Sequence, residues 1–161
     1  MKSKNVVLMI ASIFALVFVL GFISAAVAFT GVSGNTTTLE YSTSPQIVTI
    51  SFSAQDVDTI LDTYSVTGIT FAPMPLTLTS GSNTLTSAST IIGDISPGPL
   101  ATGTTSNQMS LTFTIPASQT LGNYIGTLTL SGIENSFLVT SSLQVQIKIQ
   151  DTLTKNTIFY S

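Results

Sequence analysis

The feature that most constrains the fold of this 161-residue chain is a regular alternation of apolar and polar side chains. Four segments show it: residues 46–54, 108–115, 123–131 and 143–150. In the last of these, every second residue is Leu, Val or Ile, and the residues between them are Gln or Lys. A period of two places alternate side chains on opposite faces of a β-strand. Each segment is therefore predicted to be a strand with one buried face and one face in water.

Shorter stretches are weaker strand candidates, and residues typical of turns separate them. These candidates are Thr38–Ser42, Tyr64–Phe71, Leu76–Thr79, Thr84–Ile92 and Ser136–Thr140. About seven to nine short strands, each with one apolar face, predict two antiparallel sheets packed face to face. We expect an all-β fold, a single immunoglobulin-like antiparallel β-sandwich over residues 38–151. The single indication of helix in it is one turn over Asp56–Asp62.

Threonine and serine dominate the chain after its first segment. Residues 30–161 contain 27 threonines and 19 serines. Threonine favours strands and is a poor residue for helix interiors, which supports the all-β prediction. Residues 29–37, with two glycines, an asparagine and several threonines, are expected to form a linker, and residues 152–161 a C-terminal tail.

The N-terminus carries the features of an export signal. Lys2 and Lys4 precede an uncharged apolar run from Val6 to Phe29, which ends in the small-residue pattern Ala26-Val27-Ala28. A basic start, an apolar run and an Ala-x-Ala end are typical of a secretory signal peptide. We predict a signal peptide over residues 1–28, cleaved after Ala28.

Other interpretations of this run stay open, because it is longer than the usual apolar part of a signal peptide and long enough to span a bilayer as a helix. An uncleaved membrane anchor over residues 6–29 is one alternative. A pilin-type hydrophobic helix processed after Lys4 is another, and a buried helix of a soluble fold is a third. In the three membrane interpretations the lysines stay in the cytoplasm, so residues after 30 lie outside the cell.

The composition excludes several kinds of chemistry. The chain contains no histidine and no cysteine, so it cannot form a Ser-His-Asp triad, a Cys/His zinc site or a disulfide. It has only four Lys and Arg residues and a pI near 4.3, which argues against a nucleic-acid partner. We expect no cofactor and no enzymatic activity.

One stretch resembles a known family. Residues 115–128 read Ile-Pro-Ala-Ser-Gln-Thr-Leu-Gly-Asn-Tyr-Ile-Gly-Thr-Leu. They resemble the corner between strands E and F of immunoglobulin-like and fibronectin-type-III-like domains, including those of archaeal and bacterial exported surface proteins. In that corner a Leu and a Gly precede a Tyr whose hydroxyl bonds the backbone. The resemblance implies that Leu121, Gly122 and Tyr124 form a structural corner, although the Cys and Trp of antibody domains are lacking.

Few residues suggest a site. Asp56, Asp58 and Asp62 are weak candidates for calcium ligands, because carboxylates close together in a turn can bind this ion, but their spacing is not that of an EF-hand. Asp94 and Glu134 are expected to be solvated turn residues, which argues against a catalytic carboxylate pair.

Two further features bear on modification and ligands. Asn35 begins the sequon Asn35-Thr36-Thr37 and is a candidate for glycosylation. Most of the four tyrosines are expected in the core, which leaves few aromatic faces for stacking on a sugar.

These observations favour an exported, non-enzymatic protein of the cell surface or extracellular space, with a structural or adhesive role. The alternative is a pilin-like or thread-like filament subunit, which assembles by donating a strand or by packing its hydrophobic N-terminal helix. A carbohydrate-binding module is a third, less favoured class. The expected partners are the cell envelope, other copies through sheet edges, and the membrane if the N-terminal segment is uncleaved.

Overall fold

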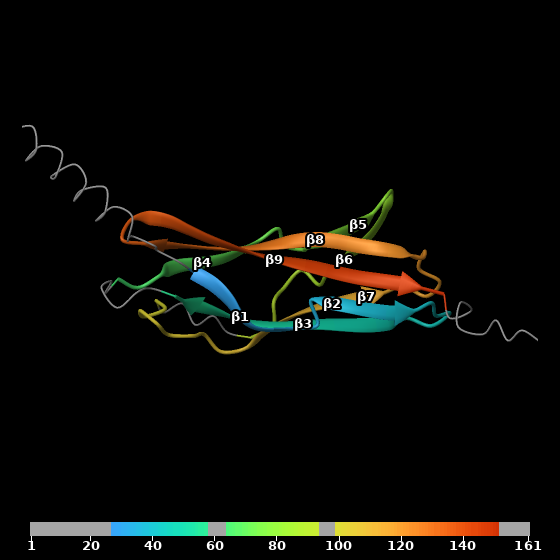
Figure 1. Cartoon of the computed structure of the whole chain (residues 1–161), viewed down its shortest axis with the longest axis horizontal. Helices are drawn as coiled ribbons and strands as arrows, with labels where there is room; N and C mark the ends of the chain where they lie inside the picture. The colour runs from blue at the N-terminus through green and yellow to red at the C-terminus, as the bar shows by residue number, and fades with distance from the viewer. Residues whose placement is uncertain (1–26, 58–63, 94–98, 152–161) are drawn as a thin grey trace, which may run out of the picture.

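The computed structural model describes residues 27–57, 64–93 and 99–151, and within them the chain is all-β, without a helix (Figure 1). Nine strands form two sheets. The strands are β1 (Val27–Ser33), β2 (Thr36–Glu40), β3 (Gln46–Asp56), β4 (Thr67–Ala72), β5 (Thr77–Ser80), β6 (Asn83–Thr86), β7 (Met109–Ile115), β8 (Gly122–Glu134) and β9 (Phe137–Gln150). Residues 1–26 of the predicted N-terminal segment and the predicted C-terminal tail lie outside the described residues, whereas Val27 and Ala28 belong to β1.

The two sheets differ in size. One has three strands in the order β1-β3-β7, and the other has the order β2-β9-β8-β5-β6, with β4 also paired to β8. All pairs are antiparallel except β2 with β9, which is parallel. The sheets lie one above the other along the length of the molecule (Figure 1). The prediction of an all-β fold with two sheets is therefore confirmed, but the larger sheet is mixed, because β2 runs parallel to β9, where we expected antiparallel pairs alone.

The four strongly alternating segments form the strands β3, β7, β8 and β9. Their apolar rows face the other sheet: in β7 the side chains of Met109, Leu111, Phe113 and Ile115 are all buried. The candidate strand over 136–140 is not separate, because it continues into residues 143–150 to form one strand, β9. The predicted helical turn does not begin at Asp56, which is the last residue of β3; residues 58–62 of it lie outside the described residues.

Aromatic rings join the two sheets near the start of β1. Phe29 of β1 packs edge-on against Phe52 of β3, with 5.4 Å between ring centroids. Phe71 of β4, in the other sheet, lies 5.5 Å from Phe52 and 6.1 Å from Phe29. Edge-to-face and tilted pairs at these distances add to the burial of apolar area. The first strand is thus part of the core.

The expected linker over residues 29–37 is wrong, because β1 and the start of β2 occupy it. The chain crosses from one sheet to the other between these strands at Gly34, which has a φ of +74°. A Cβ atom at this position would overlap the carbonyl oxygen of Thr49 on β3. Only glycine fits both the left-handed backbone and the close approach. This segment rich in Thr and Gly therefore forms two strands, one in each sheet, and the connection between them.

Candidate functional site

The three calcium candidates are not shown to form a cluster. Asp56 ends β3, where it pairs with Val27, and its side chain is fully buried. It is therefore not the exposed turn residue that the sequence suggested. Asp58 and Asp62 lie outside the described residues, as does Asp94. Among the residues that the structure does describe, no group of three or more acidic side chains is placed to hold a metal ion.

Glu134 is not the solvated turn residue that we expected, because its side chain is only 1% exposed. The reason is that β8 continues three residues beyond its predicted end at Ser131. Along this extension the alternation of faces persists, so Glu134 falls on the same inward-facing row as Leu130 and Gly132. A charged residue after a strand is typical of a turn, but here Glu134 is still part of the strand.

The three residues of the expected corner lie at the start of β8. The Tyr124 ring is fully buried, and its hydroxyl donates a hydrogen bond of 2.8 Å to the carbonyl oxygen of Thr120. The same hydroxyl accepts a bond of 2.9 Å from the side-chain amide of Gln119. Gly122 packs closely on the Ser80 side chain, and Leu121 is largely exposed. Tyr124 thus ties β8 to the chain that precedes it.

Asn35 lies in the short connection between β1 and β2. Its side-chain Nδ2 donates to the carbonyl oxygen of Gln144 over 3.3 Å, and its own carbonyl accepts from the Gln146 amide. A glycan at Nδ2 replaces one of the two hydrogens of this amide and leaves the other able to donate to the Gln144 carbonyl oxygen. Glycosylation of Asn35 stays a prediction.

Fewer tyrosines than expected are buried in the described part of the chain. Tyr124 is in the core, but Tyr41 and Tyr64 are exposed, and Tyr160 lies outside the described residues. Tyr41 follows the last residue of β2, and Tyr64 precedes β4, so neither has the strand alternation that would turn it inward. The two exposed tyrosines do not form a shared surface for stacking on a sugar. They adjoin β2 and β4, and the strands β9 and β8 lie between these two in the larger sheet.

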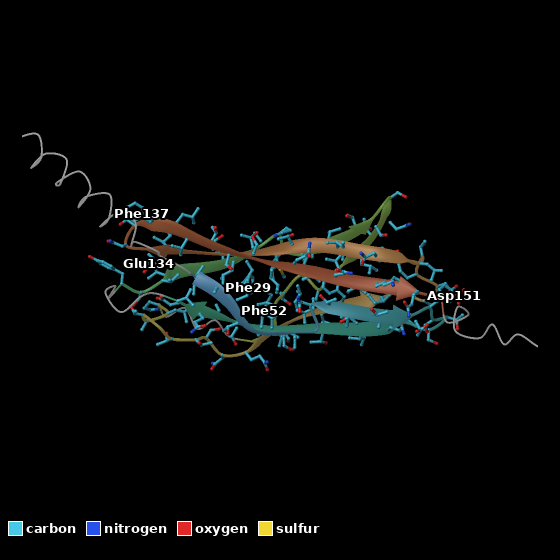
Figure 2. The ribbon with its side chains drawn as sticks, viewed as in Figure 1. Phe29, Phe52, Glu134, Phe137 and Asp151 are labelled. Atoms are coloured by element: carbon cyan, nitrogen blue, oxygen red, sulfur yellow. The ribbon has the colours of Figure 1, made fainter. Side chains whose placement is uncertain are left out.

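The feature that the sequence analysis missed is an apolar end of the sandwich. Ile133, Phe137 and Leu138 are 49%, 61% and 72% exposed, and together we call them the hairpin tip. They flank the turn between β8 and β9, and Ile133 and Leu138 are register partners. Figure 2 shows Phe137 and Glu134 at one end of the molecule and Asp151 at the other. Ile133 and Leu138 lie on the outward face of the hairpin, and Phe137, the register partner of Glu134, lies on its other face. Large apolar side chains are therefore exposed on both faces of this tip, which suggests an interaction site.

The turn that carries the hairpin tip is tight and well defined. It consists of two residues, Asn135 and Ser136, both with positive φ, at 45° and 70°. Two left-handed residues in a two-residue connection match the twist of a β-hairpin, and asparagine adopts this conformation readily. The pairing is continuous from Gly122 with Ile149 to Glu134 with Phe137. The Asn-Ser pair between Glu134 and Phe137, residue types that are common in turns, is the sequence signal for this turn.

The comparisons with known proteins identify no family. No family model matches the chain, and no curated protein is similar enough in sequence to serve as a relative. Among the described residues, no helix is both long and apolar enough to cross a membrane.

Solved structures with a related arrangement of strands exist, but the likeness is weak. The CooA pilin subunit of enterotoxigenic Escherichia coli has a TM-score of 0.45 and 14% identity, over 78% of this chain and 98% of the pilin. A PapD-like domain of human CEP192 has a TM-score of 0.43 and 14% identity, over 80% of this chain and 88% of the domain. A family 123 glycoside hydrolase from Clostridium perfringens has a TM-score of 0.34 and 10% identity, over 71% of this chain and 22% of the enzyme. These values are too low to assign a family or a function.

The fold and the surface together define the class of protein. It is a two-sheet all-β protein, with an apolar hairpin tip at one end and an apolar sequence directly ahead of its first strand.

Proposed function

We propose that this chain is an exported, non-enzymatic immunoglobulin-like β-sandwich protein that acts at the outer face of the cell membrane in a structural or adhesive role. The observation that carries the proposal is the junction at Val27. An apolar run preceded by two lysines leads, without a linker, into the first strand of a β-sandwich. Because lysines at such a run stay in the cytoplasm, the sandwich lies on the other side of the membrane.

The boundary of β1 bears on how the chain is attached. Val27 is 3% exposed and pairs with Asp56, and Ala28 pairs with Gln55. Cleavage after Ala28 would remove both residues from the strand. The uncharged stretch that remains ahead of β1, residues 6–26, is still about 20 residues long, enough to span a bilayer. These observations support an uncleaved anchor.

The structural role follows from the composition of the whole chain. Without histidine and cysteine, it lacks the groups on which most nucleophilic and zinc-dependent catalysis depends. Hydroxyl and amide side chains cover the outward faces of the strands, as in the Gln144, Gln146 and Gln150 row of β9. Such a surface suits contacts with other polar polymers or proteins of the cell envelope.

The N-terminus of the native protein tests the attachment. Intact mass and N-terminal sequencing of protein isolated from its own cells should give a chain that still contains residues 6–26 and that is recovered with the membrane fraction. A chain in the culture medium that begins at Val27 or Phe29 would contradict the anchor and leave a secreted sandwich. Recovery in the cytoplasmic fraction would contradict export itself.

A second candidate function is a subunit of a filament. β1 is an edge strand, it is the first strand of the chain, and it contributes Val27 and Phe29 to the core. A neighbouring copy can supply such a strand, because an edge strand forms backbone hydrogen bonds with only one other strand of its sheet. Chains linked in this way would form a thread.

Paired cysteines distinguish the two functions, because the natural chain has none. Ala28 and Gln55 are register partners on β1 and β3. If β1 stays in its own chain, oxidation of the double variant Ala28→Cys/Gln55→Cys gives a disulfide-linked monomer. If β1 is donated, the same oxidation gives a ladder of linked chains on a non-reducing gel. The control, Ala28→Cys alone, gives neither the monomeric disulfide nor the ladder.

A further inference from the structure

We propose that the hairpin tip is a membrane contact: Ile133, Phe137 and Leu138 insert into the lipid surface beside the chain's own N-terminal anchor. This inference rests on the proposed function, because it requires that the chain is held at a membrane. It adds the orientation of the sandwich on that membrane and the residues that fix it.

The first step is the position of the tip relative to the start of β1. β8 and β9 are the longest strands of the described fold, and their turn forms one end of the molecule (Figure 2). β1 begins toward that end, as its pairing with the last residue of β3 also requires (Figure 1). The anchor sequence therefore joins the sandwich on the side where the hairpin tip is exposed, and Asp151 lies at the far end.

The second step is the length of chain between the anchor and the fold. The uncharged sequence extends to Ala26, and Val27 is already paired in β1. Because a spanning helix needs about 20 residues, the uncharged sequence leaves hardly any residues over for a linker between an anchor and β1. A domain joined in this way stays within a few ångströms of the bilayer surface, so its near end must tolerate the lipid interface. Exposed Ile, Phe and Leu side chains are favoured there, as on the apolar face of interfacial helices.

The third step is charge, which favours an apolar contact over an electrostatic one. The lysines of the sequence are Lys2, Lys4, Lys148 and Lys155. Lys148 pairs with Thr38 and Asn123, toward the end of the sandwich opposite the tip. The described residues therefore place no basic side chain beside Ile133, Phe137 and Leu138. The contact should depend little on anionic lipid or on salt.

Tryptophan fluorescence tests the contact directly, because the natural chain contains no tryptophan. Phe137→Trp is made in the full chain, which is reconstituted into phosphatidylcholine vesicles with and without brominated acyl chains. Tyr41→Trp is the matched control: it is also an exposed aromatic position, but it lies beside Gln150 at the opposite end. Leu138→Trp is a second reporter if Phe137→Trp alters the unfolding midpoint.

The expected result is a blue-shifted emission from position 137 that the brominated lipid largely quenches, with neither effect at position 41. The quenching should be the same when part of the lipid is phosphatidylglycerol. Unquenched emission from position 137 in chains that float with the vesicles would overturn the tip contact and leave the anchor intact. Chains that do not float would overturn both. A blue shift without quenching that grows with protein density would show that the tip packs on a second copy, and would also overturn the lipid contact.

Discussion

At the scale of single residues, the fold depends on a few positions where sequence type and geometry leave little choice. Tyr124 is buried, with its hydroxyl bonded on one side to Thr120 and on the other to Gln119. Gly34 lets the chain cross from one sheet to the other. Both positions are structural, and each has a substitution that isolates its contribution to stability.

Replacing Tyr124 with Phe removes the hydroxyl and keeps the buried ring. We expect Tyr124→Phe to lower the free energy of unfolding by about 2 kcal/mol, because the two hydrogen bonds of the hydroxyl are lost, each with a typical net value of about 1 kcal/mol. Urea unfolding followed by circular dichroism measures this change. Tyr41→Phe, at an exposed tyrosine, is the control and should leave the midpoint unchanged. Equal midpoints for both variants would contradict a structural role for the corner.

Gly34 has a natural control in Gly31, which lies in β1 with a φ of +58° and open space where a Cβ would be. Gly31→Ala should cost about 1–2 kcal/mol from the left-handed backbone alone. Gly34→Ala carries the same strain and also brings its Cβ against the Thr49 carbonyl oxygen, so it should cost more. Thermal unfolding of the two variants makes the comparison. If Gly34→Ala is no less stable than Gly31→Ala, the backbone at Gly34 does not lie as close to the Thr49 carbonyl oxygen as it does in the structure.

Residue type alone could not predict which acidic side chains are buried and which are exposed. Asp56 and Glu134 look like turn residues, because charged residues in a strand-rich sequence usually lie in water. Both are buried, since each continues the inward-facing row of a strand beyond its last strongly apolar residue. The alternation was visible in the sequence, but where it stopped was not, because pairing with β1 and β9 decides the strand ends.

At the scale of elements, the alternation of apolar and polar residues predicted the strands that pack the core. The strands β3, β7, β8 and β9 were found from their alternation, because burial of one face only leaves a period-two pattern. β1 was missed for a physical reason: its first residues belong to the apolar run, and its remaining residues, with Gly31, look like a linker. The hairpin tip was missed because exposed apolar residues at a strand end look like residues of the core.

The place of β1 in the fold gives a prediction at this scale. A version of the chain that begins at Phe29 lacks Val27 and Ala28, and one that begins at Val27 keeps them. We expect the shorter version to fold but to lose about 1.5–3 kcal/mol, the value of burying one valine side chain. Urea unfolding of the two versions measures the difference. Equal stability would mean that β1 starts after Ala28, and the argument against cleavage there would fail.

At the scale of the whole molecule, the start of β1 distinguishes the two ends of the sandwich. One end has the exposed Ile133, Phe137 and Leu138 side chains and the start of β1. The other end has Asp151 and the exposed Tyr41, Ile47 and Leu121. Under the attachment that we propose, only the first end faces the lipid, and the apolar side chains of the far end stay away from it.

The central claim is that the sandwich is outside the cell and the lysines of residues 1–4 are inside. A chain without cysteine allows this to be measured by labelling single cysteines on intact cells with a membrane-impermeant maleimide. Ser82, exposed in the turn between β5 and β6, reports on the sandwich, and Ser3 reports on the N-terminus. The account predicts that Ser82→Cys is labelled on intact cells and Ser3→Cys only after lysis. A Ser82→Cys chain that is labelled only after lysis would contradict it.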